Sequence, residues 1–256
     1  MTVTIFKDSE PQFAGTHVMP NYVTFHGFVA QEESAALRRP VTPPTHRVEF
    51  LGDSITAGFD NLCDVPNSPG GHLSTASSFR RSWAPEICNA LNAECHYTAW
   101  SELGMVVNCC GGATVGSDIW KRTLATVGSS NTSDPHGTTI ENLWNFSTWK
   151  ADAVVINLGT NDGLTGGRAS FIDSYNQTYE AMVVAAAKSY GEETHFFLAC
   201  GPMSDHYCDE VNWVIGSLQA RGLKARFLDD GPNTNLDPNP DSFGGLPLGP
   251  TWLYQR

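Results

Sequence analysis

Hydrophobic and polar positions along the chain separate into short apolar runs and longer segments with helical spacing. Five runs have the apolar, β-branched character of buried strands: residues 48–51, 95–100, 153–158, 194–200 and 225–228. The clearest helical pattern follows a capping-box sequence at residues 170–173, with apolar residues from Tyr175 to Ala186 repeating on one face. Strands that alternate with helices in this way predict a parallel sheet covered on both faces.

Other helices are predicted from their boundaries. Ser82 is a candidate N-cap and Pro85 falls in the first turn, where a missing N–H costs nothing. A further helix is expected from about residue 209 to residue 221, with Gly222 as its stop. Residues 116–127 have a weaker helical pattern.

Residues 1–45 do not follow this alternation of strands and helices. Residues 3–6 and 22–29 have the alternation of β-strands, and residues 38–44 form a Pro-rich, extended linker. Two strands alone are marginally stable, so this region is expected to pack on the main domain or on further strands. The sequence therefore predicts one division, between residues 1–45 and 46–256.

The first and third strands run into turns that carry candidate chemistry. The first ends in Gly-Asp-Ser, which places Ser54 in a tight turn, with Asp53 expected to bond backbone N–H groups there. The third ends in Gly-Thr-Asn-Asp, where the side chain of Asn161 offers two N–H donors. Nucleophilic acyl transfer needs this pairing of an exposed hydroxyl and a donor for the developing oxyanion.

These motifs together resemble the SGNH hydrolases, the GDSL-type esterases. The serine of Gly-Asp-Ser is the nucleophile in that family, and the asparagine of Gly-x-Asn-Asp completes the oxyanion hole; Ser54 and Asn161 match them. Residues 97–108 resemble the glycine block, so the resemblance gives Gly104 the role of third donor. It also implies a flavodoxin-like, three-layer α/β/α fold with a five-stranded parallel sheet.

Within that superfamily the chain is most similar to carbohydrate esterase family two, whose members join an N-terminal β-sandwich to the esterase domain. The resemblance implies that residues 1–45 are the end of such a sandwich and that residues 46–256 are the esterase domain. It also implies hydrolysis of O-acetyl esters on a plant polysaccharide such as xylan. Neither a cofactor nor a metal is expected.

The family's last block, which carries a histidine base and an aspartate that orients it, does not match. The corresponding segment reads Leu246-Pro247-Leu248-Gly249-Pro250, with Gly249 at the histidine position and Leu246 at the aspartate position. A serine hydroxyl without an imidazole is a poor nucleophile at neutral pH. His206, after the fourth strand, and His72, in the loop after the first, are the candidate substitute bases.

Three functions therefore remain open. The first is an acetyl esterase acting on plant polysaccharide, and the second is a catalytically impaired member of the same family. The third is a carbohydrate-binding protein that uses the cleft and its aromatic residues without chemistry.

Composition narrows the class of partner. The net charge of −12 and a pI of about 4.9 argue against nucleic acid or an anionic membrane surface. No apolar run approaches the roughly 20 residues of a membrane-spanning helix. The partner that the family resemblance implies is an acetylated polysaccharide or oligosaccharide.

Cysteines and glycosylation motifs favour secretion. The seven cysteines contain no Cys-x-x-Cys pair, and Asn131, Asn145 and Asn176 lie in glycosylation sequons. The first residues lack the apolar core of a signal peptide, so a secreted chain without its true N-terminus is expected.

Overall fold

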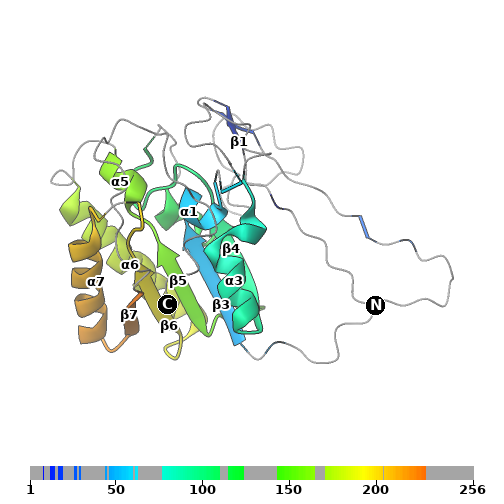
Figure 1. Cartoon of the computed structure of the whole chain (residues 1–256). Coiled ribbons are helices and arrows are strands. Elements are labelled where there is room, and N and C mark those ends of the chain that lie inside the picture. Colours follow the sequence, from blue (N-terminus) through cyan, green and yellow to red (C-terminus); the bar gives the residue numbers. More distant parts are fainter. Residues whose placement is uncertain are drawn as a thin grey trace.

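A five-stranded parallel sheet lies at the centre of the protein (Figure 1). It is seen in a computed structural model that describes most of the chain from residue 46 to residue 228. The described residues are 46–59, 61–62, 77–109, 115–123, 143–164, 171–203 and 205–228, preceded by 8, 12–14, 17–19, 26–27, 29 and 44.

The strand order is β4-β3-β5-β6-β7, and every pair is parallel. The strands are β3 (His46–Gly52), β4 (Ala93–Ala99), β5 (Ala153–Asn157), β6 (His195–Ala199) and β7 (Lys224–Leu228). Gly52 pairs with both Ala99 and Asn157, and Asn157 pairs with Ala199. Four strands therefore end level with one another, at the edge where open α/β sheets bind ligands.

Three longer helices cover the sheet. These are α3 (Trp83–Ala90), α6 (Ile172–Tyr190) and α7 (Cys208–Ala220). The short helices are α1 (Ser54–Ala57), η1 (Phe79–Arg81), α4 (Gly116–Ile119) and α5 (Thr160–Leu164). The predicted α/β architecture, a parallel sheet between helices, is confirmed.

The larger core cluster lies between the sheet and helices α6 and α7. Tyr175 and Tyr179 of α6 are fully buried there, and their hydroxyls donate to the carbonyls of Leu158 (2.7 Å) and Ile156 (3.3 Å). Because both polar tips are bonded, burial of the two rings carries no desolvation penalty for a lost partner. The predicted apolar face of α6 is the face that packs on the sheet.

The smaller core cluster lies under α3. Phe50 of β3 is fully buried there, in T-shaped contact with Trp83 (ring centroids 5.4 Å apart) and stacked on Tyr97 (5.4 Å). A disulfide between Cys88 and Cys95 joins α3 to β4.

Most helix ends fall near their predicted positions. Ser82 is the N-cap residue of α3, but its side chain makes no capping bond, so only the position of this prediction is right. Gly222 follows α7 with φ of 83°, as a helix stop requires. Only residues 116–119 of the expected 116–127 helix are helical; residues 124–127, like Ser170 of the capping box, lie outside the described residues.

The N-terminal region has a small β unit of its own. β1 (Gln12–Ala14) and β2 (His17–Met19) pair antiparallel and are separate from the central sheet. The expected strand at residues 3–6 lies outside the described residues. The prediction of a strand over residues 22–29 is wrong at its described positions, because Gly27 has φ of 110°, which a β-strand does not adopt.

The remaining features of the fold are its other disulfides and the apolar character of its helices. A second disulfide joins Cys200 to Cys208, and Cys109 is also disulfide-bonded. In the part of the chain that the structure describes, no helix has the length and apolar character needed to cross a membrane.

Candidate active site

Ser54 lies at the end of β3, in the turn that the sequence predicts. It is the first residue of α1 and is half-buried, while Asp53 before it is fully buried and accepts a hydrogen bond from the Ile55 N–H (2.9 Å). Gly52 makes the turn possible, since a Cβ there would lie 2.0 Å from Thr56 Oγ1. Asp53 thus forms the turn, as expected, and leaves Ser54 at the strand's carboxyl end.

Asn161 joins three segments at this point. Its Nδ2 donates to the carbonyl of Leu103 (2.9 Å) and, at 3.4 Å, to Oδ2 of Asp53. Ser54 follows Asp53 directly, so the Asn161 amide contacts the turn that carries Ser54; the roles of nucleophile and oxyanion donor stay predictions. The 3.4 Å contact is at the long limit of a hydrogen bond and is the weaker of the two.

Asp162 fixes the turn that faces Asn161. Its carboxylate accepts from the N–H groups of Met105 (2.7 Å), Val106 (2.7 Å) and Val107 (3.1 Å). Burial raises the pKa of Asp162, and the backbone N–H groups act in the opposite direction. The sequence analysis gave this residue no role, although its place directly after Asn161 in a strand-exit turn was a signal.

Gly104 lies in the same turn, and space alone requires a glycine there. A Cβ would lie 1.9 Å from the carbonyl oxygen of Val107 and 2.8 Å from Oδ2 of Asp162. The Gly104 N–H donates to Oδ1 of Asn108 (2.8 Å). Gly104 can therefore serve as an oxyanion donor only if this bond opens, and that role stays a prediction.

Glu102 is a second unusual residue in this turn. It is half-buried with φ of 71°, a left-handed conformation rare for a residue with a side chain, and burial raises the pKa of its carboxyl. Among the described residues no partner accepts a hydrogen bond from its N–H. Its main-chain N–H is thus another candidate donor, which the sequence gave no means of finding.

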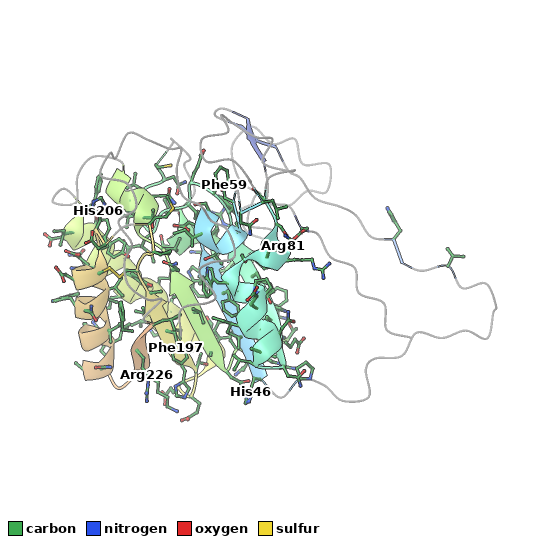
Figure 2. The ribbon with its side chains drawn as sticks, in the orientation of Figure 1. His46, Phe59, Arg81, Phe197, His206 and Arg226 are labelled. Carbon is green, nitrogen blue, oxygen red and sulfur yellow. A yellow bond between two sulfur atoms is a disulfide. The ribbon has the colours of Figure 1, made fainter. Side chains whose placement is uncertain are left out.

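Of the two candidate bases, only His206 lies among the described residues, and there it is not bonded to Ser54. His206 is exposed, in the loop closed by the Cys200–Cys208 disulfide, and Figure 2 shows it above α7, away from the Phe59 label beside α1. Within the described ranges, no hydrogen bond links His206 to Ser54. His72 and the segment with Leu246 and Gly249 lie outside the described residues.

A metal centre has no support in the described part of the chain. No group of three or more His, Cys, Asp or Glu residues there could hold an ion. What the described residues offer is a serine in a strand-exit turn, an amide bonded to the residue before it, and a hydrogen-bonded turn at residues 103–107, which are the kinds of group that acyl transfer uses.

The model of the GDSL-like lipase/acylhydrolase family matches residues 48–204, more than half of the chain. The protein belongs to this family. Its members are acyl hydrolases, and the matched region spans the Ser54, Gly104 and Asn161 segments.

Two curated relatives of this GDSL-family chain are carbohydrate-active. The cellulase/esterase CelE of Acetivibrio thermocellus is 31% identical over 169 residues, which cover 63% of this chain and 18% of that protein. The acetylxylan esterase/glucomannan deacetylase of Cellvibrio japonicus is 24% identical over 207 residues, covering 78% and 54%. The chain therefore spans about half or less of the length of these relatives.

Solved structures give the same picture of this GDSL-family fold. A family-two carbohydrate esterase from Clostridium thermocellum, in complex with cellohexaose, is 28% identical with a TM-score of 0.61 and covers 75% of this chain and 55% of its own. An acetyl xylan esterase from Butyrivibrio proteoclasticus matches the fold with a TM-score of 0.67 at 17% identity, covering 84% and 62%.

Proposed function

We propose that this protein is a serine carbohydrate esterase that hydrolyses O-acetyl esters of a plant polysaccharide. The observation that supports the proposal is the contact of Asn161 Nδ2 with Leu103 and with Asp53, the residue directly before Ser54. The names of the relatives, an acetylxylan esterase/glucomannan deacetylase among them, supply the substrate class.

The reaction runs in two acyl-transfer steps. Ser54 Oγ attacks the acetyl carbonyl carbon, its proton goes to a base, and the tetrahedral oxyanion takes a hydrogen bond from Asn161. The C–O bond to the sugar then breaks, and the sugar hydroxyl leaves with the proton. Water attacks the acetyl-serine in the same way and releases acetate.

The second oxyanion donor is a main-chain N–H of the turn at residues 102–104. The Glu102 N–H has no acceptor among the described residues, whereas the Gly104 N–H is held by Asn108. Asn161 can turn one N–H to the oxyanion by giving up its 3.4 Å contact with Asp53, the weaker of its two bonds.

The base is assigned to His206 or His72 in this proposal. His206 leaves the carboxyl end of β6, two strands from β3 in the sheet, and is exposed. A catalytically impaired protein that binds carbohydrate is the second candidate, favoured by the absence of a Ser54–His206 bond in the described structure and by the cellohexaose complex of a relative.

Two further assignments belong to this proposal. Residues 1–45 are the end of an N-terminal β-sandwich, which is supported by the separate antiparallel pair β1–β2. The protein is secreted, which is supported by the disulfides Cys88–Cys95 and Cys200–Cys208, since such bonds persist in oxidising compartments.

Acetate release tests the function directly. We expect acetylated xylan and p-nitrophenyl acetate to be hydrolysed, with kcat/KM lowered at least about a thousandfold in Ser54→Ala. Ser189→Ala is the matched control, because Ser189 is a half-buried serine of α6 whose hydroxyl donates to the Ala185 carbonyl (3.0 Å) within its own helix. Equal rates in Ser54→Ala and the intact chain would refute the serine assignment.

Two more measurements identify the base and test the alternative that the protein binds carbohydrate without hydrolysing it. Loss of activity in His206→Ala, with folding unchanged, would assign the base to His206. No hydrolysis by the intact chain, together with retained binding of acetylated xylo-oligosaccharides, would replace the esterase by the carbohydrate-binding function.

A further inference from the structure

Glu102 is the residue through which the turn after β4 reaches the surface. Its neighbours at positions 100, 101 and 103–105 are all buried, whereas Glu102 is half-buried. Strand β4 ends at Ala99, paired with Gly52 of β3, so this turn lies at the same edge of the sheet as Ser54. Glu102 therefore places a partly exposed carboxyl group at the edge where open α/β sheets bind ligands.

Asn161 connects the turn of Glu102 to the turn of Ser54. Its Nδ2 donates at 2.9 Å to the carbonyl of Leu103, the residue after Glu102. The same Nδ2 contacts Oδ2 of Asp53, the residue before Ser54, at 3.4 Å. Glu102 and Ser54 are both half-buried, and each is next in sequence to a buried residue that this one amide contacts.

The backbone of Glu102 indicates that its side chain has a function. Its φ of 71° is a left-handed conformation that glycine adopts without steric cost and that a residue with a Cβ rarely adopts. Strained residues of this kind cluster at active sites and at sites that hold ligands. A glutamate at a position suited to glycine is explained if its carboxyl group makes a contact that glycine cannot make.

The carboxyl group of Glu102 has no partner in the described part of the chain. No hydrogen bond or ion pair reaches it there, and burial raises its pKa. An ionised carboxylate only accepts hydrogen bonds, and its two oxygens can take several. Because burial has removed part of its water, a ligand that supplies donors would restore hydrogen bonds that the group has lost.

We propose that the Glu102 carboxylate binds hydroxyl groups of the sugar that carries the acetyl ester. This inference rests on the proposed esterase function, since a sugar whose acetyl group lies at Ser54 is held beside the turn at residues 101–104. Sugars offer many hydroxyl donors, and hydrogen bonds to an ionised acceptor are stronger than those to a neutral one. Among the described residues Glu102 makes no hydrogen bond to Ser54, so it binds the sugar and is not the base.

Substrates with and without a sugar test the proposal. In Glu102→Ala, kcat/KM for acetylated xylo-oligosaccharides is expected to fall about 10- to 100-fold, as for loss of a hydrogen bond to a charged group. For p-nitrophenyl acetate, which has no sugar, kcat/KM is expected to stay within about twofold. Alanine keeps the Cβ and therefore the strained backbone, so this variant removes the carboxylate alone. Glu102→Gln keeps one acceptor oxygen and is expected to lose less.

Glu192→Ala is the matched control. Glu192 is an exposed glutamate in the turn between α6 and β6, at the opposite end of the sheet from Ser54. Its replacement is expected to leave kcat/KM unchanged for both kinds of substrate.

The other outcomes overturn the proposal. Equal losses on both substrates in Glu102→Ala would show that Glu102 acts on the chemistry or on the fold of the turn. No loss on either would show that it does not contact the sugar.

Calorimetric binding keeps the inference separate from the esterase function. If the intact chain hydrolyses neither substrate, that function fails, and the affinity for acetylated xylo-oligosaccharides decides the role of Glu102. A Kd about tenfold weaker in Glu102→Ala would support the contact. An equal Kd, or no binding by the intact chain, would overturn it.

Discussion

Glu102 has a strained backbone, in the turn that carries the candidate oxyanion donors. With φ of 71°, it adopts a left-handed backbone that costs a residue with a Cβ roughly 1–2 kcal/mol. The neighbouring Leu103 carbonyl accepts the shorter bond of Asn161. Strained residues persist where surrounding bonds over-determine them, and here Asp162 supplies three such bonds on the other side of Gly104.

Replacing Glu102 by glycine is expected to stabilise the protein. Glu102→Gly removes the steric cost of the left-handed backbone and is expected to raise the free energy of unfolding by about 1 kcal/mol, after the entropy lost to glycine in the unfolded chain. Glu102→Gln is the control, because it removes the charge and keeps the strain. Urea denaturation of both variants measures the effect, and equal midpoints would contradict it.

Asp162 is expected to be among the most sensitive residues of the site. Asp162→Ala leaves the N–H groups of Met105, Val106 and Val107 without their acceptor, so we expect a loss of about 3 kcal/mol or more. Asp162→Asn keeps one carbonyl oxygen and is expected to lose less. Denaturation midpoints compare the two; an alanine variant as stable as the intact chain would show that the turn is held elsewhere.

Among the helices and strands, the pattern of burial could be predicted from the sequence, whereas the geometry of the loops could not. β5 and β6 were predicted because their central residues are apolar on both faces, and β3 because three of the four residues 48–51 are apolar; α6 was predicted because its buried tyrosines and aliphatics repeat at helical period. Ser54 and Asn161 were predicted as site residues because each lies in the turn after such a strand, and that prediction stays untested.

The features that the sequence pattern did not predict include a turn that depends on contacts between residues distant in the sequence. The Gly104 N–H is bonded to Asn108, and Glu102 is strained, in a turn that Asp162 holds by hydrogen bonds. Asp162 lies 57 residues after Met105, the first residue whose N–H it accepts. The strands β1 and β2 are three residues each, too short for alternation to be detected. No local pattern contains this information.

The loop between β6 and α7 depends on its disulfide. Cys200 and Cys208 close it at both ends, with His206 inside. Replacing both by serine is expected to cost roughly 2–3 kcal/mol of stability through the entropy of the unfolded chain. The matched control is Cys88→Ser/Cys95→Ser, which opens a ring of similar length between α3 and β4.

Activity distinguishes the two disulfides. If His206 is the base, the Cys200/Cys208 pair of substitutions is expected to lower kcat/KM well below the level of the Cys88/Cys95 pair at equal folded fraction. Equal activities, measured on p-nitrophenyl acetate below both melting temperatures, would contradict a role of the closed loop.

For the whole molecule, Glu49 predicts how stability changes with pH. Glu49 is buried in the centre of β3, where it accepts a hydrogen bond from the Tyr190 hydroxyl, and burial raises its pKa from 4.5 to about 7. The folded state thus binds this proton more tightly than the unfolded state. Its stabilising contribution is complete below pH 4.5 and is lost as pH rises to 7, a change of roughly 3 kcal/mol.

Glu49→Gln isolates this effect, because glutamine can still accept from Tyr190 but does not titrate. The variant is expected to gain stability relative to the intact chain between pH 5 and pH 8, measured by urea denaturation. His96, whose pKa is lowered by burial, acts in the opposite direction in both proteins and cancels in the difference. A constant difference across this range would mean that Glu49 keeps an ordinary pKa.

The attachment of Asp8 has a mechanical consequence. Its carboxylate accepts from Ser78 Oγ (2.8 Å) and the Arg80 N–H (2.7 Å), and Asn61 in turn holds both backbone groups of Ser78 at 2.8 Å. The Ser78 N–H also reaches the carbonyl of Gly58, the residue that ends α1. A force applied at Asp8 is therefore transmitted through a few hydrogen bonds to the helix that begins with Ser54, and pulling the chain there would load the turn that holds the proposed nucleophile.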